Sequence, residues 1–347
     1  MPEARRMRAS VGLSPPTTKE TRMSSHSQSR RRTLKTLAAI SALAGVTGSG
    51  TCMSAWARTG MQEPVPWTKG TEHASLKMPA DATDCHHHIY DHRYPLASGA
   101  TLKPGDATVD DYRRLQRRLG TSRNVVIQPS SYGTDNRLLL ASIAAFNGRA
   151  RGIAVVDDTV SQAELEALHR GGVRGIRFNV VVPGPATVEM IEPLAQRIAP
   201  MGWHVQVNAS AATILSARQI WYRLPCPVVF DHLAHIPEPD ALTHPAFHLV
   251  TDLLAQGKAY VKLTGFYNES TVGAPTYSDS VAVAAAYARA APQQVVWGSD
   301  WPHPTEQPLH RIPDDALLLD LLAKAVPDEG ARNRILVGNP TTLYHFG

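Results

Sequence analysis

The amino-acid sequence predicts an α/β fold of the (β/α)8, or TIM-barrel, class. Eight short apolar runs alternate with eight longer segments in which apolar residues recur at the 3.6-residue period of a helix. Strands that alternate with helices form a parallel sheet, and eight such units close into a barrel. An open, doubly wound sheet is the alternative, but no Gly-x-Gly-x-x-Gly or phosphate-loop pattern follows the first run.

The predicted elements follow one another from residue 82 to residue 325. Strands are expected at Ala82–Ile89, Asn124–Gln128, Gly152–Val156, Val173–Val180, His204–Asn208, Pro227–His232, Ala259–Leu263 and Val295–Ser299. Helices are expected at Val109–Leu119, Asn136–Phe146, Gln162–Arg170, Val188–Ala199, Ala211–Leu224, Ala241–Ala255, Asp279–Ala290 and Asp314–Ala325. The third helix is preceded by Ser161 and has Glu164 in its first turn, which is the pattern of a capping box.

The chain of 347 residues is expected to consist of a leader, a linker and one catalytic domain. In the leader, residues 1–57, three arginines (30–32) precede an apolar run from Thr36 to about Val46, and Ala55-Trp56-Ala57 forms a small-x-small cleavage site. This pattern is typical of a twin-arginine signal peptide, so we expect the precursor to engage the export machinery and the mature protein to be periplasmic. A disordered basic tail is the alternative. The linker is expected at residues 58–80 and the catalytic domain at residues 81–347.

Composition argues against binding to nucleic acid or to a membrane. The isoelectric point is near 9.1, but residues 1–57 hold nine of the 35 basic and two of the 30 acidic residues, which leaves 26 basic against 28 acidic residues elsewhere. The basic character therefore belongs to the leader. Its apolar run is too short for a stable membrane anchor. Cys85 and Cys226 lie in apolar runs and are expected to be buried free thiols.

The run Asp84-Cys85-His86-His87-His88 is the centre of the predicted site. On a strand, alternate side chains share a face, so Asp84, His86 and His88 are expected on one face, with Cys85, His87 and Ile89 on the other. A His-x-His pair on a strand can hold a metal ion or polarise a carbonyl group. A solvated, tag-like histidine tract is the alternative.

Polar residues follow most of the other predicted strands. In a (β/α)8 barrel the carboxyl ends of the strands meet on one rim, where catalytic groups lie. Each residue alone has a structural explanation, since an aspartate can cap a turn and a histidine can be a satisfied core residue. Together they predict an active site. These residues are Ser130, Tyr132, Arg177, Asn208, His232, Tyr267 and Asp300.

Three motifs in the sequence resemble the amidohydrolase superfamily. They are Asp-x-His-x-His at 84–88, Val-Phe-Asp-His-Leu at 229–233, and Val-Trp-Gly-Ser-Asp-Trp-Pro-His-Pro at 296–304. More narrowly, residues 80–347 look like the branch of metal-independent or singly metallated sugar and muconate lactonases. The resemblance implies a hydrolase with Asp300, His86, His88 and His232 as catalytic residues. It also implies Ser130, Tyr132, Arg177, Asn208 and Tyr267 as substrate-binding residues.

The cofactor stays open at this point. Asp300 can accept a proton from water, and the three histidines can polarise a carbonyl directly or through one bound Zn²⁺ or other divalent metal, for which His86, His88, His232 and Asp300 would be the ligands. Metal-free catalysis needs no more than these side chains. Dinuclear amidohydrolases use a bridging lysine near strand four and a histidine at the end of strand five. The chain has no lysine at the first place and Asn208 at the second, so a two-metal site is not expected.

The resemblance also narrows the substrate. The pyrone dicarboxylate lactonases carry a tyrosine where this chain has Asn208, and further arginines near Pro183 and Asn268. We therefore expect a small-molecule anionic lactone of the muconolactone type, sulfonated or carboxylated, opened by water in the catabolism of aromatic compounds. A sugar-acid lactone isomerase, a decarboxylase, a lactonase for another sugar or pyrone lactone, and an inactive ligand-binding barrel are the alternatives. The sequence names neither the lactone nor the oligomeric state.

Overall fold

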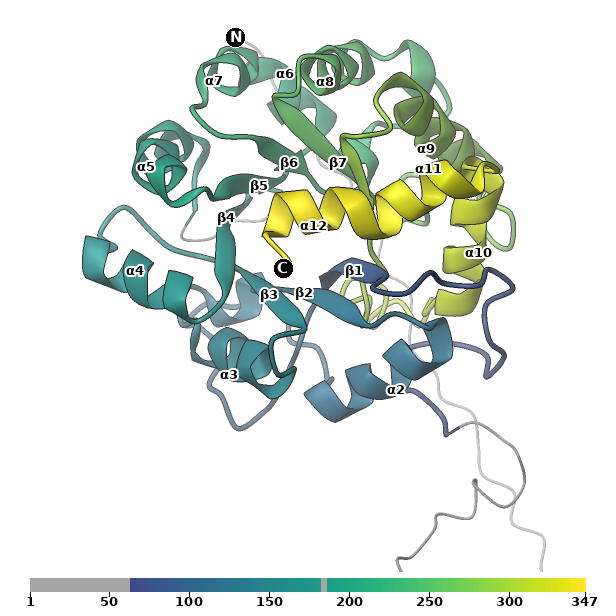
Figure 1. Cartoon of the computed structure of the whole chain (residues 1–347), viewed down its shortest axis with the longest axis horizontal. Coiled ribbons are helices and arrows are strands. Elements are labelled where there is room, and N and C mark those ends of the chain that lie inside the picture. Colours follow the sequence, from purple (N-terminus) through teal and green to yellow (C-terminus); the bar gives the residue numbers. More distant parts are fainter. Residues whose placement is uncertain (1–62, 182–185) are drawn as a thin grey trace, which may run out of the picture. The chain divides into compact units, whose positions relative to one another are not determined.

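A computed structural model describes residues 63–181 and 186–347, so the predicted leader lies outside the described residues (Figure 1). Eight parallel strands follow one another around a single sheet in chain order. Asp300 N donates to His86 O and His88 N donates to Trp301 O, both at 2.8 Å, which joins the last strand to the first. The predicted (β/α)8 barrel is therefore confirmed. The strands are β1 (Thr83–His87), β2 (Arg123–Ile127), β3 (Ala150–Ala154), β4 (Val173–Asn179), β5 (His204–Asn208), β6 (Val228–Phe230), β7 (Ala259–Leu263) and β8 (Val295–Trp297).

Helices surround the strands, as Figure 1 shows. Those that alternate with the strands are α2 (Val109–Leu119), α3 (Arg137–Ala145), α4 (Gln162–Arg170), α5 (Ile191–Ile198), α6 (Ala211–Ser216), α7 (Arg218–Arg223), α8 (Pro245–Ala255), α9 (Ser278–Ala290) and α10 (Asp315–Ala325). After α10 the chain adds α11 (Glu329–Asn333), a π-helical turn (Arg334–Gly338) and α12 (Asn339–Tyr344), which the sequence did not predict.

Three predicted helices differ from the structure. The segment Val188–Ala199 becomes α-helical only at Ile191, after a 3-10 turn at Val188–Met190. The segment Ala211–Leu224 is two helices that meet at Ala217. The segment Ala241–Ala255 becomes α-helical only at Pro245, because proline is favoured in the first helical turn and the His244 side chain accepts a hydrogen bond from Ala246 N. The capping box of α4 is confirmed: Ser161 Oγ accepts from Glu164 N, and the Glu164 carboxylate accepts from Ser161 N.

A bulge in β1 corrects part of its predicted register. Its pairing with β2 shifts between Asp84 and His87. The Cys85 side chain consequently belongs to the barrel interior, in an apolar cluster with Val125, Ile153 and Val229. Asp84 points away from the predicted site and accepts hydrogen bonds from Tyr112 of α2 and from Ser299. The predicted face is therefore wrong for Cys85 and Asp84. Cys85 and Cys226 are free thiols, Cys85 buried and Cys226 partly so.

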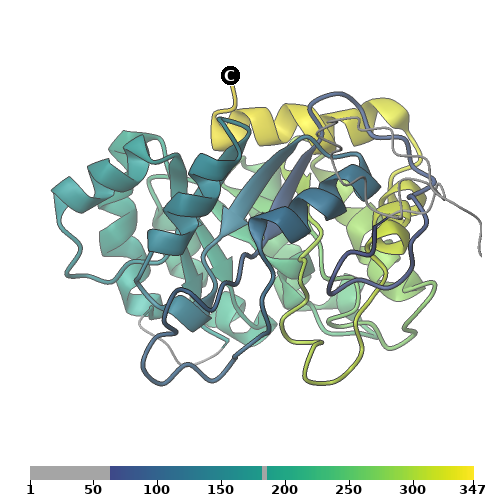
Figure 2. The same ribbon diagram turned by 90° about the horizontal axis from the view of Figure 1, so that it is seen from below.

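Helix α12 lies across the end of the barrel at which the strands begin. Its residues Leu343 and Tyr344, followed by Phe346, join the interior cluster. The Arg123 and Arg151 guanidinium groups, at the starts of β2 and β3, lie 5.2 and 4.6 Å from the Phe346 ring centroid. Figure 2 shows α12 at one end of the barrel and the loops that follow β1 and β8 at the other. The carboxyl ends of the strands thus remain available for a site.

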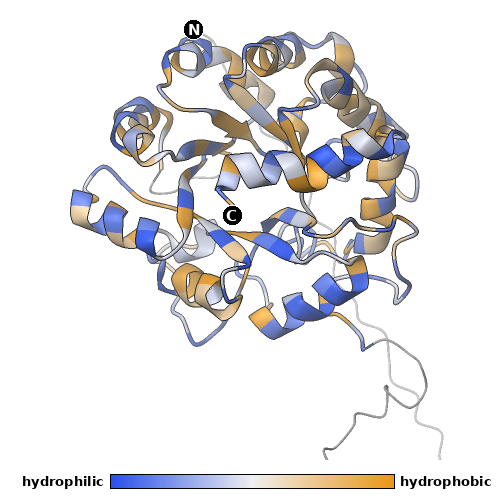
Figure 3. Ribbon diagram, viewed as in Figure 1, coloured by the Kyte–Doolittle hydropathy of each residue, from blue (hydrophilic) through white to orange (hydrophobic). Residues whose placement is uncertain are grey.

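Hydropathy follows this architecture. In Figure 3 the hydrophobic colour dominates β6 and β7, whereas the outer turns of α2 and α4 are hydrophilic. The described part of the predicted linker, residues 63–80, packs against the barrel: Trp67 Nε1 donates to Asp106 O, and Trp301 Nε1 donates to Pro66 O. Within the described ranges, no helix has both the length and the apolar character that a bilayer crossing requires.

Candidate active site

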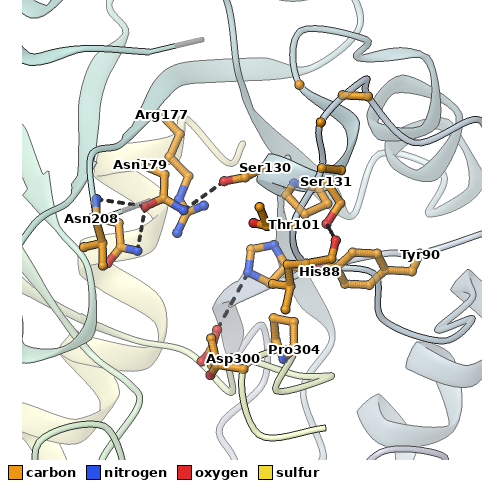
Figure 4. A pocket seen from close by; sticks show the side chains of 18 of the residues that line it. His88, Tyr90, Thr101, Ser130, Ser131, Arg177, Asn179, Asn208, Asp300 and Pro304 are labelled. Atoms are coloured by element: carbon orange, nitrogen blue, oxygen red, sulfur yellow. Dashed lines mark hydrogen bonds and ion pairs between the residues drawn. The ribbon is translucent and has the colours of Figure 1, made fainter. Parts of the chain in front are cut away.

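A cavity of about 480 Å³ opens at the carboxyl ends of the strands. Figure 4 shows His88 and Asp300 near its floor and Arg177, Asn179 and Asn208 along one wall. Such a volume suits a small molecule. Of the predicted site residues, those that line it are His88, Ser130, Arg177, Asn208, His232 and Asp300. His86 lies directly below, fully buried.

The four predicted catalytic residues come together at the floor of the cavity. His86 Nε2 lies 3.3 Å from His88 Nε2 and 3.6 Å from the Asp300 carboxylate. His88 Nε2 is 3.8 Å, and His232 Nδ1 is 3.9 Å, from that carboxylate. His87 points the opposite way, stacked on Tyr112 at a centroid distance of 3.5 Å. The predicted alternation therefore holds from His86 to His88.

Burial sets the charge of these groups. Removal from water lowers the pKa of His88 to about 3 and holds the pKa values of His86 and His232 well below the usual range, so all three rings are neutral near pH 7. Burial raises the pKa of Asp300 to about 6, and the His303 charge and a hydrogen bond from Tyr267 oppose that rise. Asp300 is thus a carboxylate poised to accept a proton near neutral pH.

The predicted residue Tyr267 lies behind Asp300. Its hydroxyl donates to Asp300 Oδ2 at 2.6 Å and lies 3.0 Å from His303 Nδ1, while His303 Nε2 is 3.1 Å from Asp315. Burial opposes protonation of His303, but the neighbouring carboxylates, Asp315 first, raise its pKa. Tyr267 therefore orients the carboxylate of Asp300 and is not among the residues that line the cavity.

Left-handed backbone aims several of these side chains. Asp300 has φ 64° and His232 has φ 48°, values that non-glycine residues rarely adopt. The residues from His232 to His235 are all left-handed, which brings the His232 and His235 rings within 5.3 Å of each other. Such conformations persist only where surrounding structure enforces them, and they concentrate at functional sites.

A buried charge cluster lies beneath the histidines. Asp231 Oδ2 accepts from Arg177 Nε at 3.1 Å and from Gln206 Nε2 at 3.2 Å, and Lys262 Nζ lies 3.5 Å from Asp231 Oδ1. Burial would raise the pKa of Asp231, but the neighbouring charges of Lys262 and Arg177 hold it well below its usual value. Burial lowers the pKa of Lys262 to about 8. Sequence reasoning missed Lys262, although a lysine in the otherwise apolar β7 was a signal.

One wall of the cavity carries a row of polar groups. Asn179 Nδ2 donates to Ser130 Oγ at 2.8 Å, and Asn208 Nδ2 donates to Asn179 Oδ1 at 3.1 Å. Asn208 Oδ1 lies 2.7 Å from His235 Nε2. Within the described residues, the two terminal nitrogens of Arg177 make no hydrogen bond. This wall can therefore bind an anionic group, and its members Asn179 and His235 were not predicted.

Tyr132 has a different place from the one expected. Its hydroxyl accepts from Asp91 N at 2.9 Å and donates to Asp91 O at 3.2 Å, and the ring is buried. It is not among the lining residues, because its polar end is used by the loop after β1. Tyr132 thus supports the wall of the cavity from behind.

The floor of the cavity could hold one metal ion. Donor atoms of His86, His232 and Asp300 all lie within 4.8 Å of one another, and this is the one such cluster in residues 63–181 and 186–347. His232 Nδ1 is buried and has no hydrogen-bond partner in that part of the chain. With His88 beside them, these residues form the predicted His3Asp set, which suits Zn²⁺ with one position open for water.

Comparison with known proteins identifies the family of the chain. The amidohydrolase family model matches residues 83–346. The chain is 32% identical over 291 residues to the 2-pyrone-4,6-dicarboxylate hydrolase of Comamonas testosteroni, an alignment that covers 80% of this chain and 94% of that protein. It is 30% identical over 275 residues to the 4-sulfomuconolactone hydrolase of Rhizobium radiobacter (78% and 92% covered). It is 30% identical over 268 residues to the D-galactarolactone isomerase of Agrobacterium fabrum (77% and 91%).

A solved structure shares the fold. An apo crystal structure from Agrobacterium tumefaciens superposes with a TM-score of 0.75 at 28% sequence identity, covering 81% of this chain and 99% of that one. The family model's match, residues 83–346, runs from β1 to beyond α12 and includes the His-x-His, Asp-His and Ser-Asp segments of this chain. The chain belongs to the amidohydrolase family.

Proposed function

We propose that this protein is a lactonase that opens an anionic lactone of the muconolactone type, sulfonated or carboxylated, by attack of water. One observation carries the proposal. The cavity holds a carboxylate with a raised pKa, Asp300, together with the guanidinium of Arg177, whose terminal nitrogens are unused by the described residues. The first is a general base and the second an anchor for an acid group. The named activities of the relatives support the same reaction class.

The reaction follows from these positions. Asp300 takes a proton from water, whose oxygen then bonds to the lactone carbonyl carbon. An imidazole N–H at the floor, for which His232 among the lining residues is a candidate, donates to the carbonyl oxygen as negative charge develops on it. The ring C–O bond breaks, and the proton held by Asp300 passes to the leaving oxygen. A bound divalent metal would add Lewis-acid polarisation and a more acidic water.

The cavity favours one anchored anionic group over several. Arg177 is the one arginine or lysine among its described lining residues, and the neighbouring wall offers neutral amides and hydroxyls. A dicarboxylated pyrone would leave a second carboxylate without a cation, which costs free energy when the group loses water. A single cation in the lining therefore favours a lactone with one anionic group over the pyrone dicarboxylate.

A lactone panel tests the proposal. The purified mature protein is assayed against muconolactones, sugar-acid lactones and the pyrone dicarboxylate, with acid release and ring opening followed separately, before and after chelation and with metal analysis. Stoichiometric acid release from a muconolactone is expected. A product that keeps its ring would instead establish an isomerase, the activity named for one relative.

We also propose that the protein works in the periplasm after twin-arginine export. The support is sequence alone, since Arg30 and Arg31 precede the apolar run that ends before Ala57. Replacing both arginines with lysine should retain the precursor in the cytoplasm, and the mature protein should begin near Arg58. Recovery of unprocessed chain from the native host would rule this out.

A further inference from the structure

The proton on the buried ring of His86 can be placed from its neighbours. His88 Nδ1 lies 2.9 Å from the carbonyl oxygen of Ile127. A carbonyl only accepts hydrogen bonds, so His88 carries its proton on Nδ1. The ring is buried and its Nε2 lies 3.8 Å from the nearest carboxylate, that of Asp300, so nothing there holds a second proton and Nε2 is a bare acceptor. The contact of 3.3 Å between His86 Nε2 and His88 Nε2 needs one proton, and His86 must supply it.

The contacts of the other nitrogen of His86 indicate that it is bare as well. His86 Nδ1 lies 3.3 Å from Lys262 Nζ and 3.3 Å from Asp231 Oδ1. Lysine only donates and aspartate only accepts, so the two neighbours favour opposite tautomers of His86. Two protons of Lys262 go to Cys85 O at 2.9 Å and to Gln206 Oε1 at 2.7 Å. The third faces His86 Nδ1 at 3.3 Å and Asp231 Oδ1 at 3.5 Å, and of these two contacts only the one with His86 has the geometry of a hydrogen bond.

We propose that Lys262 is a positioning residue that keeps the His86 proton on Nε2, and thereby makes His86 a hydrogen-bond donor toward the site and a poor metal ligand. The hydrogen bonds then run in one direction: Lys262 donates to His86, His86 to His88, and His88 to Ile127. A metal ion needs the lone pair of Nε2. His86 can offer it only when its proton moves to Nδ1 and Asp231 replaces Lys262 as the partner.

This inference rests on the proposed function only in treating His86 as part of an active site. The tautomer itself is a property of the free protein. It predicts that metal affinity is limited by Lys262 and not by the number of ligands. Without the lysine, Asp231 would accept the Nδ1 proton of His86, as carboxylates do for metal-bound histidines. Lys262→Met should therefore tighten zinc binding by about tenfold, within the range that such supporting partners exert.

Nitrogen NMR of the histidine rings tests the proposal directly. In protein labelled with ¹⁵N-histidine, with the His86 signals assigned by their loss in His86→Gln, the metal-free wild type should show His86 protonated on Nε2 and His88 on Nδ1. An Nδ1-protonated His86 in the wild type would overturn the proposal. This measurement needs neither substrate nor turnover, so a failed lactonase assay leaves it standing, and the reverse also holds.

Zinc competition against a chelator gives the second measurement. Lys262→Met should bind zinc more tightly than wild type and show His86 protonated on Nδ1. Lys258→Met is the matched control, since Lys258 Nζ donates to Tyr222 O away from the site and its loss should change neither result. A folded Lys262→Met with unchanged zinc affinity would contradict the proposal. If that variant does not fold, the wild-type tautomer decides.

Discussion

Asp300 connects the charge of the site to the pH of the reaction. Burial raises its pKa to about 6, and the base works only when ionised, so kcat/KM should fall tenfold per pH unit below about pH 6. Folding favours the protonated form of such a group. Its contribution to stability is therefore present below the unfolded pKa and is lost as pH rises through 6.

Tyr267→Phe should shift the pH dependence further. The substitution removes a hydrogen bond that lowers the pKa of Asp300, so the pH at which kcat/KM begins to fall should move to a higher value.

Replacement of the carboxylate tests the same assignment. Asp300→Asn preserves shape and should reduce turnover by roughly 10²-fold or more, the usual contribution of a positioned base, with a smaller change in substrate binding. If the variant keeps its turnover and loses thermal stability, Asp300 only caps a turn, and the proposed mechanism fails.

Arg177 should tolerate lysine poorly. Its Nε is held by Asp231, which leaves the planar end of the guanidinium to pair with a carboxylate or sulfonate. Lysine offers a point charge without that fork, so Arg177→Lys should lower kcat/KM for an anionic lactone by about tenfold, equivalent to about 1.4 kcal/mol. A neutral lactone is the control substrate and should be affected less. Equal losses on both would indicate that the arginine acts mainly through Asp231.

His87 separates stability from chemistry. It is buried, stacks on Tyr112, and its Nε2 lies 3.0 Å from Asn124 Oδ1. His87→Ala leaves a cavity and an unpaired amide oxygen, which should cost about 2 kcal/mol or more in unfolding free energy. The folded enzyme should keep its turnover, whereas His88→Ala should abolish it. Denaturant unfolding and single-temperature assays measure the two effects separately.

The positions of individual residues were predictable where the alternation of side chains along a strand alone decides which face each side chain occupies. His86, His88 and Asp300 met as expected, since each lies at or just beyond the carboxyl end of a strand, on the same rim. Cys85 did not follow, because a bulge is a tertiary adjustment that leaves no mark in a local pattern. Lys262 was missed for a related reason: a buried lysine is stabilised by Gln206 and Asp231 from other strands, which no local pattern brings together.

Among the helices, α4 allows a test of how much a capping box in the local sequence contributes to stability. Its N-terminus is closed by reciprocal hydrogen bonds between Ser161 and Glu164 at an exposed position far along the chain from the catalytic residues. Ser161→Ala should lower the unfolding free energy by about 1 kcal/mol and leave kcat unchanged. Ser161→Asp, which retains a capping oxygen, should restore the stability. A change in kcat would show that α4 is coupled to the site.

Helix boundaries were predictable where such caps lie close in sequence. Boundaries inside an interrupted helix were not predictable. At Ala217, between α6 and α7, the apolar period continues across the break. The left-handed segment from His232 to His235 was equally hidden, since none of its residues is glycine. Tertiary contacts enforce that conformation, and they also bring His235 to the cavity wall.

At the scale of the barrel, repetition made the fold predictable. Each strand and its following helix carry their own periodicity, and parallel pairing of successive units leaves few other topologies. The closing helix α12 was not expected. Its apolar residues are too few to show a helical period, and their role depends on packing against the open end of the barrel. These residues are Leu343 and Tyr344, followed by Phe346. The chain therefore separates a catalytic end from an end devoted to stability.

That separation makes a last prediction. Phe346 is 5% exposed and packs in the interior cluster beneath the strands, close to the guanidinium groups of Arg123 and Arg151. Phe346→Ala removes this ring and should cost about 3–5 kcal/mol, the range for deleting a buried phenylalanine. Because the cavity lies at the opposite ends of the strands, kcat/KM measured well below the new melting temperature should equal that of the wild type. Phe346→Leu, which keeps most of the apolar volume, should recover part of the lost stability. A large fall in kcat/KM in folded Phe346→Ala would show instead that strain at the closed end reaches His86 and Asp300 through the barrel.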